Sequence, residues 1–321
     1  MSRLIRNPTV ERALLLTKTA SDWIVAKLLG LFLHVAKKLP AEKSTDFAEK
    51  FARSLALVLP RSKMARKNIA LAFPEKTPQE VDDIVRGVWG NVGRTIAEYV
   101  FLDQLIDIRP DDQDAARIEL VGLENFHKLR DSKKPVVIFT GHTGNWEILP
   151  VAAATYGLHI TALFRPPNNQ FLAKKVLKAR RTDGGHLVPS RAGAAWALAS
   201  VLDKDGAVGL LADQAFTKGP LVQFMGREAT ANPLASKLAR QFDCDIHPAR
   251  CIRLPKGRFR IELGGPIDIA RKEDGNIDMQ ATTQAINTII EGWVREYPEQ
   301  WLWLHDRWKI KQIPGRTRKP L

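Results

Sequence analysis

From Val121 onward the sequence alternates between short apolar runs and longer amphipathic segments, and no other feature constrains the fold as strongly. The runs of strand length are residues 135–139, 158–164, 207–212, 245–254 and 258–263. The segments with a helical pattern are residues 145–156, 169–181, 192–202, 232–242 and 279–297. Alternating strands and helices favour a parallel sheet that is covered by helices. We therefore predict an α/β fold with a mostly parallel central sheet flanked by helices, and an antiparallel edge near residues 245–263.

The sequence before this alternation has a helical pattern. Apolar residues recur at helical spacing through residues 44–106, and Thr77 followed by Pro78 is a typical helix start. We expect one main domain at residues 44–321, in which a helical part at 44–106 precedes an α/β core at 121–321.

Residues 1–43 form an N-terminal helical extension that is both basic and apolar. Its apolar run, residues 23–36, begins at Trp23 and contains Lys27. As a helix this run would span about 21 Å, which is shorter than the ~30 Å hydrocarbon core of a bilayer. We expect the segment to lie on a membrane surface with its lysines reaching toward water. An amphipathic helix that packs on the domain is the alternative.

Basic residues outnumber acidic ones by 49 to 35, and this excess favours an anionic partner. A phosphorylated substrate, an anionic lipid surface and an acidic carrier protein all satisfy it. Nucleic acid is disfavoured because the chain has no aromatic-basic RNA motif and no helix-turn-helix signature. The two cysteines, Cys244 and Cys251, predict no disulfide framework, and we expect them to be inert and partly buried. Metal-ligand spacings and nucleotide fingerprints are also missing, so we expect no metal and no cofactor.

The first strand candidate leads into the sequence Gly141-His142-Thr143-Gly144-Asn145-Trp146-Glu147. On one continuous helix His142 and Glu147 would be rotated by about 500°, which places them ~140° apart on different faces. They can meet only if the chain turns between them, and the two glycines permit such a turn. We expect Asn145 near a helix N-cap and Glu147 in the first turn. There Glu147 could hold one imidazole nitrogen and leave the other as a general base. The alternative is a histidine packed in a turn, beside an acid that favours the helix dipole.

Polar residues also follow two further strand candidates. Arg165 comes directly after residues 158–164, and Asp213 comes directly after residues 207–212. If these strands are parallel, His142, Arg165 and Asp213 face one crevice at the carboxyl ends of the strands, where open α/β sheets bind ligands. A solvated loop cation and a turn residue are the ordinary alternatives for Arg165 and Asp213.

Nucleophile motifs are missing from the chain. No G-x-S-x-G sequence occurs, and neither cysteine has an activating neighbour in sequence. A histidine base without a protein nucleophile would activate a substrate hydroxyl or a water molecule directly.

The longest distinctive motif lies near the C-terminus, in Tyr297-Pro298-Glu299-Gln300-Trp301-Leu302-Trp303-Leu304-His305-Asp306-Arg307-Trp308-Lys309. It closely resembles the C-terminal signature of the late lipid A biosynthesis acyltransferases, the lauroyl/myristoyl family that acts on Kdo-bearing precursors. His142-Thr143-Gly144-Asn145-Trp146-Glu147 has the H-x₄-(D/E) form of glycerolipid and lipid A acyltransferases. Further blocks resemble this family in the same order: Arg66-Lys67-Asn68 with Phe73-Pro74-Glu75, Phe164-Arg165-Pro166-Pro167-Asn168-Asn169, Asp213-Gln214, Phe224-Met225-Gly226 and Ala229-Thr230.

The resemblance implies a glycerolipid-acyltransferase-like fold. It also implies transfer of an acyl chain from acyl carrier protein to a hydroxyl of a phosphorylated lipid A precursor, at the cytoplasmic face of the inner membrane. By this resemblance His142 is the general base and Glu147 orients it, without a covalent acyl-enzyme. Arg165, with Asn168 and Asp213, is assigned to substrate binding or to the oxyanion.

Three alternatives remain open at this point. The acceptor could be another glycolipid, such as a mannosylated phosphoinositide, because its acyltransferases share the H-x₄-(D/E) core. The chain could also be a peripheral membrane-binding protein that has lost catalysis. Finally, Trp301, Trp303 and Trp308 suit either the headgroup region of a membrane or the packed core at the chain end.

Overall fold

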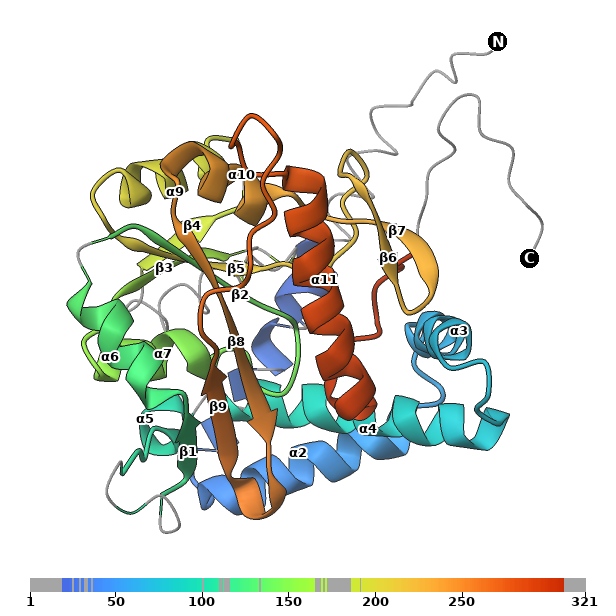
Figure 1. Ribbon diagram of the computed structural model, residues 1–321. Helices are drawn as coiled ribbons and strands as arrows, with labels where there is room; N and C mark the ends of the chain where they lie inside the picture. The colour runs from blue at the N-terminus through green and yellow to red at the C-terminus, as the bar shows by residue number, and fades with distance from the viewer. Residues whose placement is uncertain are drawn as a thin grey trace, which may run out of the picture.

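The computed structural model describes residues 19–24, 26–28, 30–31, 34–35, 37–99, 101–109, 112, 116–132, 134–164, 169, 171, 186–190 and 192–308. In this part of the chain a central sheet is enclosed by helices, as predicted (Figure 1). The seven strands run in the order β1-β9-β8-β2-β5-β3-β4. Their bounds are β1 Ile118–Val121, β2 Val136–Thr140, β3 Ile160–Phe164, β4 His186–Pro189, β5 Ala207–Leu211, β8 Asp245–Arg253 and β9 Phe259–Leu263.

All neighbouring strands of this sheet are parallel except β8 and β9, which are antiparallel. The predicted antiparallel pairing is therefore confirmed, but its predicted place at the edge is wrong. β1 pairs with β9 on the outer side, because its short sequence from Ile118 to Val121 supplies an additional parallel strand. A separate antiparallel hairpin is formed by β6 (Leu221–Phe224) and β7 (Arg227–Thr230).

Helices cover both faces of the sheet, and the apolar side chains of β2 are buried on both faces. Val137 and Phe139 are buried in one core with α9 (Ala194–Leu202), α10 (Leu234–Phe242) and α11 (Met279–Glu296). Val136 and Ile138 are buried in another core on the opposite face, with α6 (Leu123–Asp131) and α7 (Ile148–Thr155). An apolar run without polar alternation is typical of a parallel strand that is covered on both sides.

The helical part before the sheet consists of α2 (Ala41–Leu55), α3 (Ser62–Ala72), α4 (Pro78–Glu98) and α5 (Leu102–Leu105). Helices α2 and α4 pack side by side along the lower edge of the molecule (Figure 1). The predicted start of α4 is confirmed: Thr77 is its N-cap, Pro78 follows, and Glu80 completes a capping box. Within the described residues, no helix combines the length and apolarity needed to cross a membrane.

Other predicted elements differ from the structure at their ends. The helix expected to start at Asn145 begins at Ile148, because residues 141–147 form an irregular loop. Most of the helix expected at residues 169–181 lies outside the described residues. The N-terminal segment 1–43 is only partly described, and its separation as a membrane-associating unit stays a prediction.

Candidate active site

His142 and Asp213 meet at the carboxyl ends of two neighbouring strands. β2 and β5 are parallel, and Thr140 at the end of β2 is in register with Leu211 at the end of β5. The chain therefore places His142 and Asp213, each two residues beyond its strand, next to each other. The Asp213 carboxylate accepts from the His142 backbone amide at 2.7 Å and pairs with the imidazole Nδ1 at 2.8 Å. The predicted crevice at the strand ends thus contains both residues.

Asp213 is held as a buried carboxylate with three donors. Its side chain is 2% exposed, and besides the two bonds from His142 it accepts from the Trp301 indole Nε1 at 2.7 Å. Burial alone would raise the pKa of Asp213, but the charge and hydrogen bonds of His142 and the bond from Trp301 outweigh it. The net effect keeps the pKa of Asp213 below its ordinary value. Asp213 is therefore ionised throughout the neutral pH range.

This pairing fixes the tautomer of His142. An ionised carboxylate only accepts hydrogen bonds, so the ring proton of the neutral imidazole lies on Nδ1. Nε2 then carries a lone pair and is the basic atom. The His142 ring lies on the wall of a pocket, so a substrate in the pocket can reach this nitrogen.

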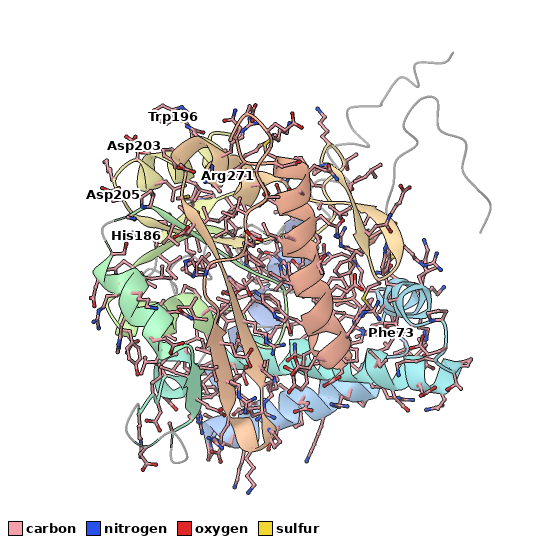
Figure 2. All side chains as sticks on the ribbon, viewed as in Figure 1. Phe73, His186, Trp196, Asp203, Asp205 and Arg271 are labelled. Carbon is pink, nitrogen blue, oxygen red and sulfur yellow. The ribbon has the colours of Figure 1, made fainter. Side chains whose placement is uncertain are left out.

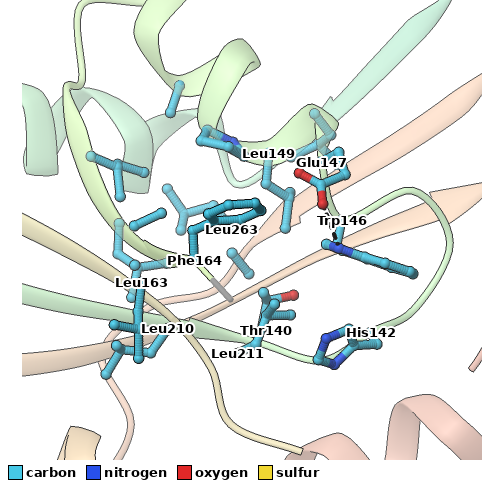
Figure 3. Close-up of a pocket in the computed structure, with 18 of the residues that line it drawn as sticks. Thr140, His142, Trp146, Glu147, Leu149, Leu163, Phe164, Leu210, Leu211 and Leu263 are labelled. Carbon is cyan, nitrogen blue, oxygen red and sulfur yellow. Dashed lines mark hydrogen bonds between the residues drawn. The ribbon is translucent and has the colours of Figure 1, made fainter. Parts of the chain in front are cut away.

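Asp213 occupies the position that the sequence analysis assigns to Glu147. Nδ1 carries one hydrogen, and this hydrogen forms the hydrogen bond to Asp213, so none is left for Glu147. The Glu147 carboxylate instead accepts from the Trp146 indole at 3.0 Å, and the Trp146 ring stands edge-on to the His142 ring at 5.0 Å. Figure 3 shows the Trp146 indole between Glu147 and His142. Glu147 is the N-cap residue of α7 and lines the same pocket.

The pocket extends from His142 between the sheet and α7 and has a volume of about 570 Å³. Its wall is mostly apolar, and Figure 3 shows leucines, Phe164 and Thr140 arranged around it. The side chains of the sheet that line it include Ile138, Ile160, Ala162, Leu211, Ala249, Ile261 and Leu263. Such a volume and lining suit an extended apolar group whose reactive end lies beside the His142 imidazole.

Comparison with known proteins gives the class of this site. The family model described as bacterial lipid A biosynthesis acyltransferase matches residues 8–310. The chain belongs to this family. It is therefore an acyltransferase, as the resemblance of its motifs predicted.

Several known relatives of this acyltransferase have low sequence identity to it, but the similarity covers most of each chain. A lipid A biosynthesis acyltransferase of Haemophilus influenzae is 22% identical over 75% of this chain and 73% of that protein. The lipid A biosynthesis lauroyltransferase of Escherichia coli is 23% identical over 80% of this chain and 82% of that protein. A phosphatidylinositol mannoside acyltransferase of Mycolicibacterium smegmatis is 23% identical over 76% of this chain and 78% of that protein.

In this acyltransferase the C-terminal motif and the histidine loop form one structure. The Leu302 amide donates to the His142 carbonyl at 3.0 Å, and the Gly144 amide donates to the Gln300 carbonyl at 3.1 Å. Thr143 and Trp301 form an antiparallel bridge between these two bonds. The C-terminal motif therefore lines the loop and also supplies the Trp301 indole to Asp213.

This arrangement decides between the two interpretations of the C-terminal tryptophans. Trp301 and Trp303 are buried, and their rings contact each other edge to face at 4.6 Å. The Trp303 indole donates to the Pro298 carbonyl at 2.7 Å. Trp308 is partly buried, and its indole donates to the Phe224 carbonyl at 3.3 Å. Core packing is the interpretation that the structure supports.

The loop from His142 to Glu147 needs a glycine at one of the two predicted positions. Gly144 has φ +57°, and a Cβ atom there would overlap the Cys251 carbonyl oxygen. Gly141 has ordinary space around its Cα atom. The turn that separates His142 from α7 therefore depends on Gly144.

A buried network of charged and polar side chains forms hydrogen bonds to the same loop. The Asn145 side chain is fully buried and donates to Glu98 Oε2 at 2.8 Å. Glu98 is also bonded by both terminal nitrogens of Arg253, and Arg253 Nε donates to Asn91 at 2.9 Å. The Asn91 amide in turn donates to the Gly144 carbonyl at 3.0 Å. α4, β8 and the histidine loop are thereby joined.

Four further residues of the predicted site and family blocks are Arg165, Asn168, Gln214 and His305. Arg165 and Asn168 lie outside the described residues. Gln214 and His305 were part of family blocks but had no assigned function, and both line the pocket beside His142. Two positions in the sequence could have indicated that these residues belong to the site: Gln214 directly follows Asp213, and His305 lies within the C-terminal motif.

Proposed function

We propose that this acyltransferase moves a fatty acyl chain from the thioester of acyl carrier protein to a hydroxyl of a phosphorylated lipid A precursor. One observation carries the proposal: the His142 imidazole faces an apolar pocket while a buried, ionised Asp213 holds its Nδ1 proton. The pocket suits a fatty chain, and the lone pair on Nε2 suits the removal of a proton from an alcohol.

In the proposed reaction the acceptor hydroxyl gives its proton to His142 Nε2 while its oxygen attacks the thioester carbonyl carbon. Asp213 stabilises the imidazolium that forms, as the carboxylate does in other carboxylate–histidine pairs. The tetrahedral intermediate then collapses, the carbon–sulfur bond breaks, and the imidazolium protonates the leaving sulfur. Base catalysis of this kind contributes about 10²–10⁴-fold to the rate.

The two cysteines support a mechanism without a covalent acyl-enzyme. Burial raises the pKa of Cys244 to about 11 and, together with the charge of Glu98, the pKa of Cys251 to about 12. Cys251 lies beneath the histidine loop and is fully buried. Among the described residues that line the pocket there is no serine and no cysteine. The acceptor hydroxyl is therefore the nucleophile in our proposal.

We also propose substrate contacts for Arg165, Asn168 and Glu147. In the sequence Arg165 and Asn168 follow Phe164, the last residue of β3, and β3 pairs with β5, which Asp213 follows. They suit the phosphate groups of the acceptor or the charge of the intermediate. Glu147 lines the pocket and suits a hydroxyl of the acceptor sugar.

An exposed apolar face of α2 supports contact with a membrane. Phe47 and Phe51 stack on each other and are 59% and 55% exposed, and the exposed Leu55 is one helical turn further along α2. Val58, which follows α2, is also exposed. The sequence from residue 37 to residue 67 has nine basic and three acidic residues. An apolar stripe within basic surroundings fits an anionic lipid surface, so we propose peripheral association with the cytoplasmic face of the inner membrane.

A test of this membrane contact is sedimentation with vesicles that contain anionic phospholipid. Replacing Phe47 and Phe51 by Ser should reduce the bound fraction, whereas replacing Trp196 by Ser, an exposed residue on another helix (Figure 2), should leave it unchanged. Equal binding of both variants would contradict the role of α2.

The main test of the proposed function is transfer of a labelled acyl chain from acyl carrier protein to a tetra-acylated lipid A precursor. H142A should reduce turnover at least 10²-fold. H186A is a matched control, because His186 is exposed on the edge strand β4 (Figure 2). Near-wild-type turnover of H142A would contradict the mechanism.

A second acceptor is favoured by one comparison. A phosphatidylinositol mannoside acyltransferase matches 76% of this chain, at an identity similar to that of the lipid A relatives. The mass of lipid A from cells with and without the gene separates the two acceptors. Loss of one acyl chain supports the lipid A precursor, and unchanged lipid A supports another glycolipid.

A further inference from the structure

Gln214 lies between two histidines in the pocket. Its side-chain nitrogen is 3.3 Å from His142 Nε2 and 3.0 Å from His305 Nε2. The two rings are 5.8 Å apart, so the carboxamide group bridges them. Gln214 therefore lies directly beside the atom that removes the proton in the proposed function.

The direction of these hydrogen bonds follows from Asp213. Because Nδ1–H of His142 donates its hydrogen bond to Asp213, Nε2 is an acceptor and needs a donor opposite it. The carboxamide NH₂ supplies that donor, whereas its oxygen would face the lone pair of the ring. The second N–H of the same group is directed to His305 Nε2. Each of the two N–H bonds of Gln214 thus has one imidazole as its acceptor.

Five backbone amides of the histidine loop are already used within the protein. The amides of residues 142, 143, 144, 147 and 148 donate, in that order, to Asp213, Gly141, Gln300, the Asn145 side chain and the Asn145 carbonyl. An acyl transfer needs donors near the carbonyl oxygen, because that oxygen becomes negatively charged in the tetrahedral intermediate. These five amides are therefore occupied, and the side-chain N–H of Gln214 beside His142 is placed to contribute instead.

We infer that the Gln214 carboxamide is this donor and that His305 is a positioning residue that holds it. The inference rests on the proposed function. When the acceptor hydroxyl binds to His142 Nε2, it replaces the N–H of Gln214 there. The released N–H turns to the thioester carbonyl oxygen, while the other N–H stays on His305. As the oxygen–carbon bond forms and the hydroxyl proton moves to Nε2, the Gln214 bond to the carbonyl oxygen becomes charge-assisted and therefore stronger. It weakens again when the carbon–sulfur bond breaks.

The position of Gln214 is set by the same elements as the base. Gln214 follows Asp213 at the end of β5, and His305 follows Trp301, which donates to Asp213. The carboxylate that orients His142 and the carboxamide beside its Nε2 are therefore neighbours in the chain. A shift of β5 relative to β2 would displace both together.

The first experiment measures kcat and KM for Q214M, which keeps the length of the side chain but has no N–H. Removal of one donor of an oxyanion costs about 10²–10³-fold in kcat, so we expect a loss of this size with unchanged KM for both substrates. Q214E is the second variant, because an ionised carboxylate keeps the shape and accepts but does not donate. Q104M is the control, because Gln104 is exposed on α5. Thermal unfolding of each variant is measured beside the wild type.

The second experiment tests the role of His305. H305Q retains an acceptor for the Gln214 N–H, so its kcat should be closer to the wild-type value than that of H305F, which has none. In the double variant Q214M/H305F the loss should be no larger than in Q214M alone, because His305 acts through Gln214.

The outcomes separate this inference from the function on which it rests. A wild-type protein that transfers no acyl chain to either glycolipid overturns both. If the wild type is active, wild-type kcat in folded Q214M or Q214E overturns the inference alone. A raised KM for the acceptor with unchanged kcat would also overturn it, since it would make Gln214 an acceptor-binding residue. Equal kcat of H305Q and H305F would overturn the positioning role of His305.

Discussion

The pairing of His142 with Asp213 makes a strong prediction for the variant D213N. The change is isosteric, but the asparagine has one acceptor oxygen for three donors and adds an NH₂ group. If that NH₂ group faces the imidazole, Nδ1 must become the acceptor and the proton moves to Nε2. The base is then in the wrong tautomer. An Asp-to-Asn change of this kind in a serine protease lowers kcat about 10⁴-fold, so we expect a loss of about 10³–10⁴-fold in acyl transfer.

The same variant has a defined effect on stability. Hydrogen bonds to a charged group contribute about 1.5–3 kcal/mol each, and asparagine can replace part of them, so we expect a loss of about 2–3 kcal/mol at neutral pH. The folded-state pKa of Asp213 is below its ordinary value of 3.8. Its ionised form therefore stabilises the protein above pH 3.8, and this contribution is lost as the pH falls through the lowered pKa. The difference in free energy of unfolding between wild type and D213N should narrow as the pH falls below about 4.

The assays are acyl transfer at saturating substrate and urea unfolding at several pH values. D203N is the matched control, because Asp203 is exposed at the end of α9 (Figure 2). A D213N enzyme within tenfold of wild type would refute the assignment of Asp213 as the orienting acid. If E147Q lost activity and D213N did not, the role would return to Glu147.

Other predictions concern residues around this pair. W301F removes one donor from the buried carboxylate, and it should lower the free energy of unfolding by about 1–3 kcal/mol and turnover by less than D213N does. G144A forces a side chain into a positive-φ position against a carbonyl oxygen, so a loss of about 1–3 kcal/mol or more should be visible in denaturant unfolding. R253M takes the closest cation from the buried Glu98 and should cost about 3–5 kcal/mol by the same measurement; a cost under 1 kcal/mol would contradict the network. Iodoacetamide at pH 8 should not modify Cys251 in the native protein but should do so in urea, as mass spectrometry can show, because burial raises its pKa to about 12.

The sheet and its principal helices were predictable because their signal is local. The strand from Val136 to Thr140 and the helix from Leu234 to Phe242 each contain enough apolar residues to mark their own bounds within two residues. β1 and β4 were missed because they have only four residues each, and β1 contains Glu119. Strands of this length obtain their stability from their neighbours in the sheet, so the sequence of the strand itself has little pattern.

The active site was predictable in part. The position of a residue directly after a strand indicates which end of the sheet it occupies, and this was sufficient to bring His142 and Asp213 into one crevice. The choice between Asp213 and Glu147 as the orienting acid depends on how the loop turns after Gly144. That turn is determined by Cys251, Gln300 and Asn91, which are distant in sequence. A short motif therefore indicated the histidine that we propose as the base, but not which carboxylate it contacts.

The location of the C-terminal motif explains why two distant motifs belong to one site. His142 needs an acid that is buried yet ionised, and burial alone would raise the pKa of that acid. Three donors offset this effect, and one of them, the Trp301 indole, comes from the C-terminal motif. Residues 300 and 302 of the same motif hold the loop through backbone bonds, and those bonds also use the Gly144 amide. The segment that keeps Asp213 charged thus also occupies the Gly144 amide, and in our inference the Gln214 side chain supplies a donor beside His142 instead.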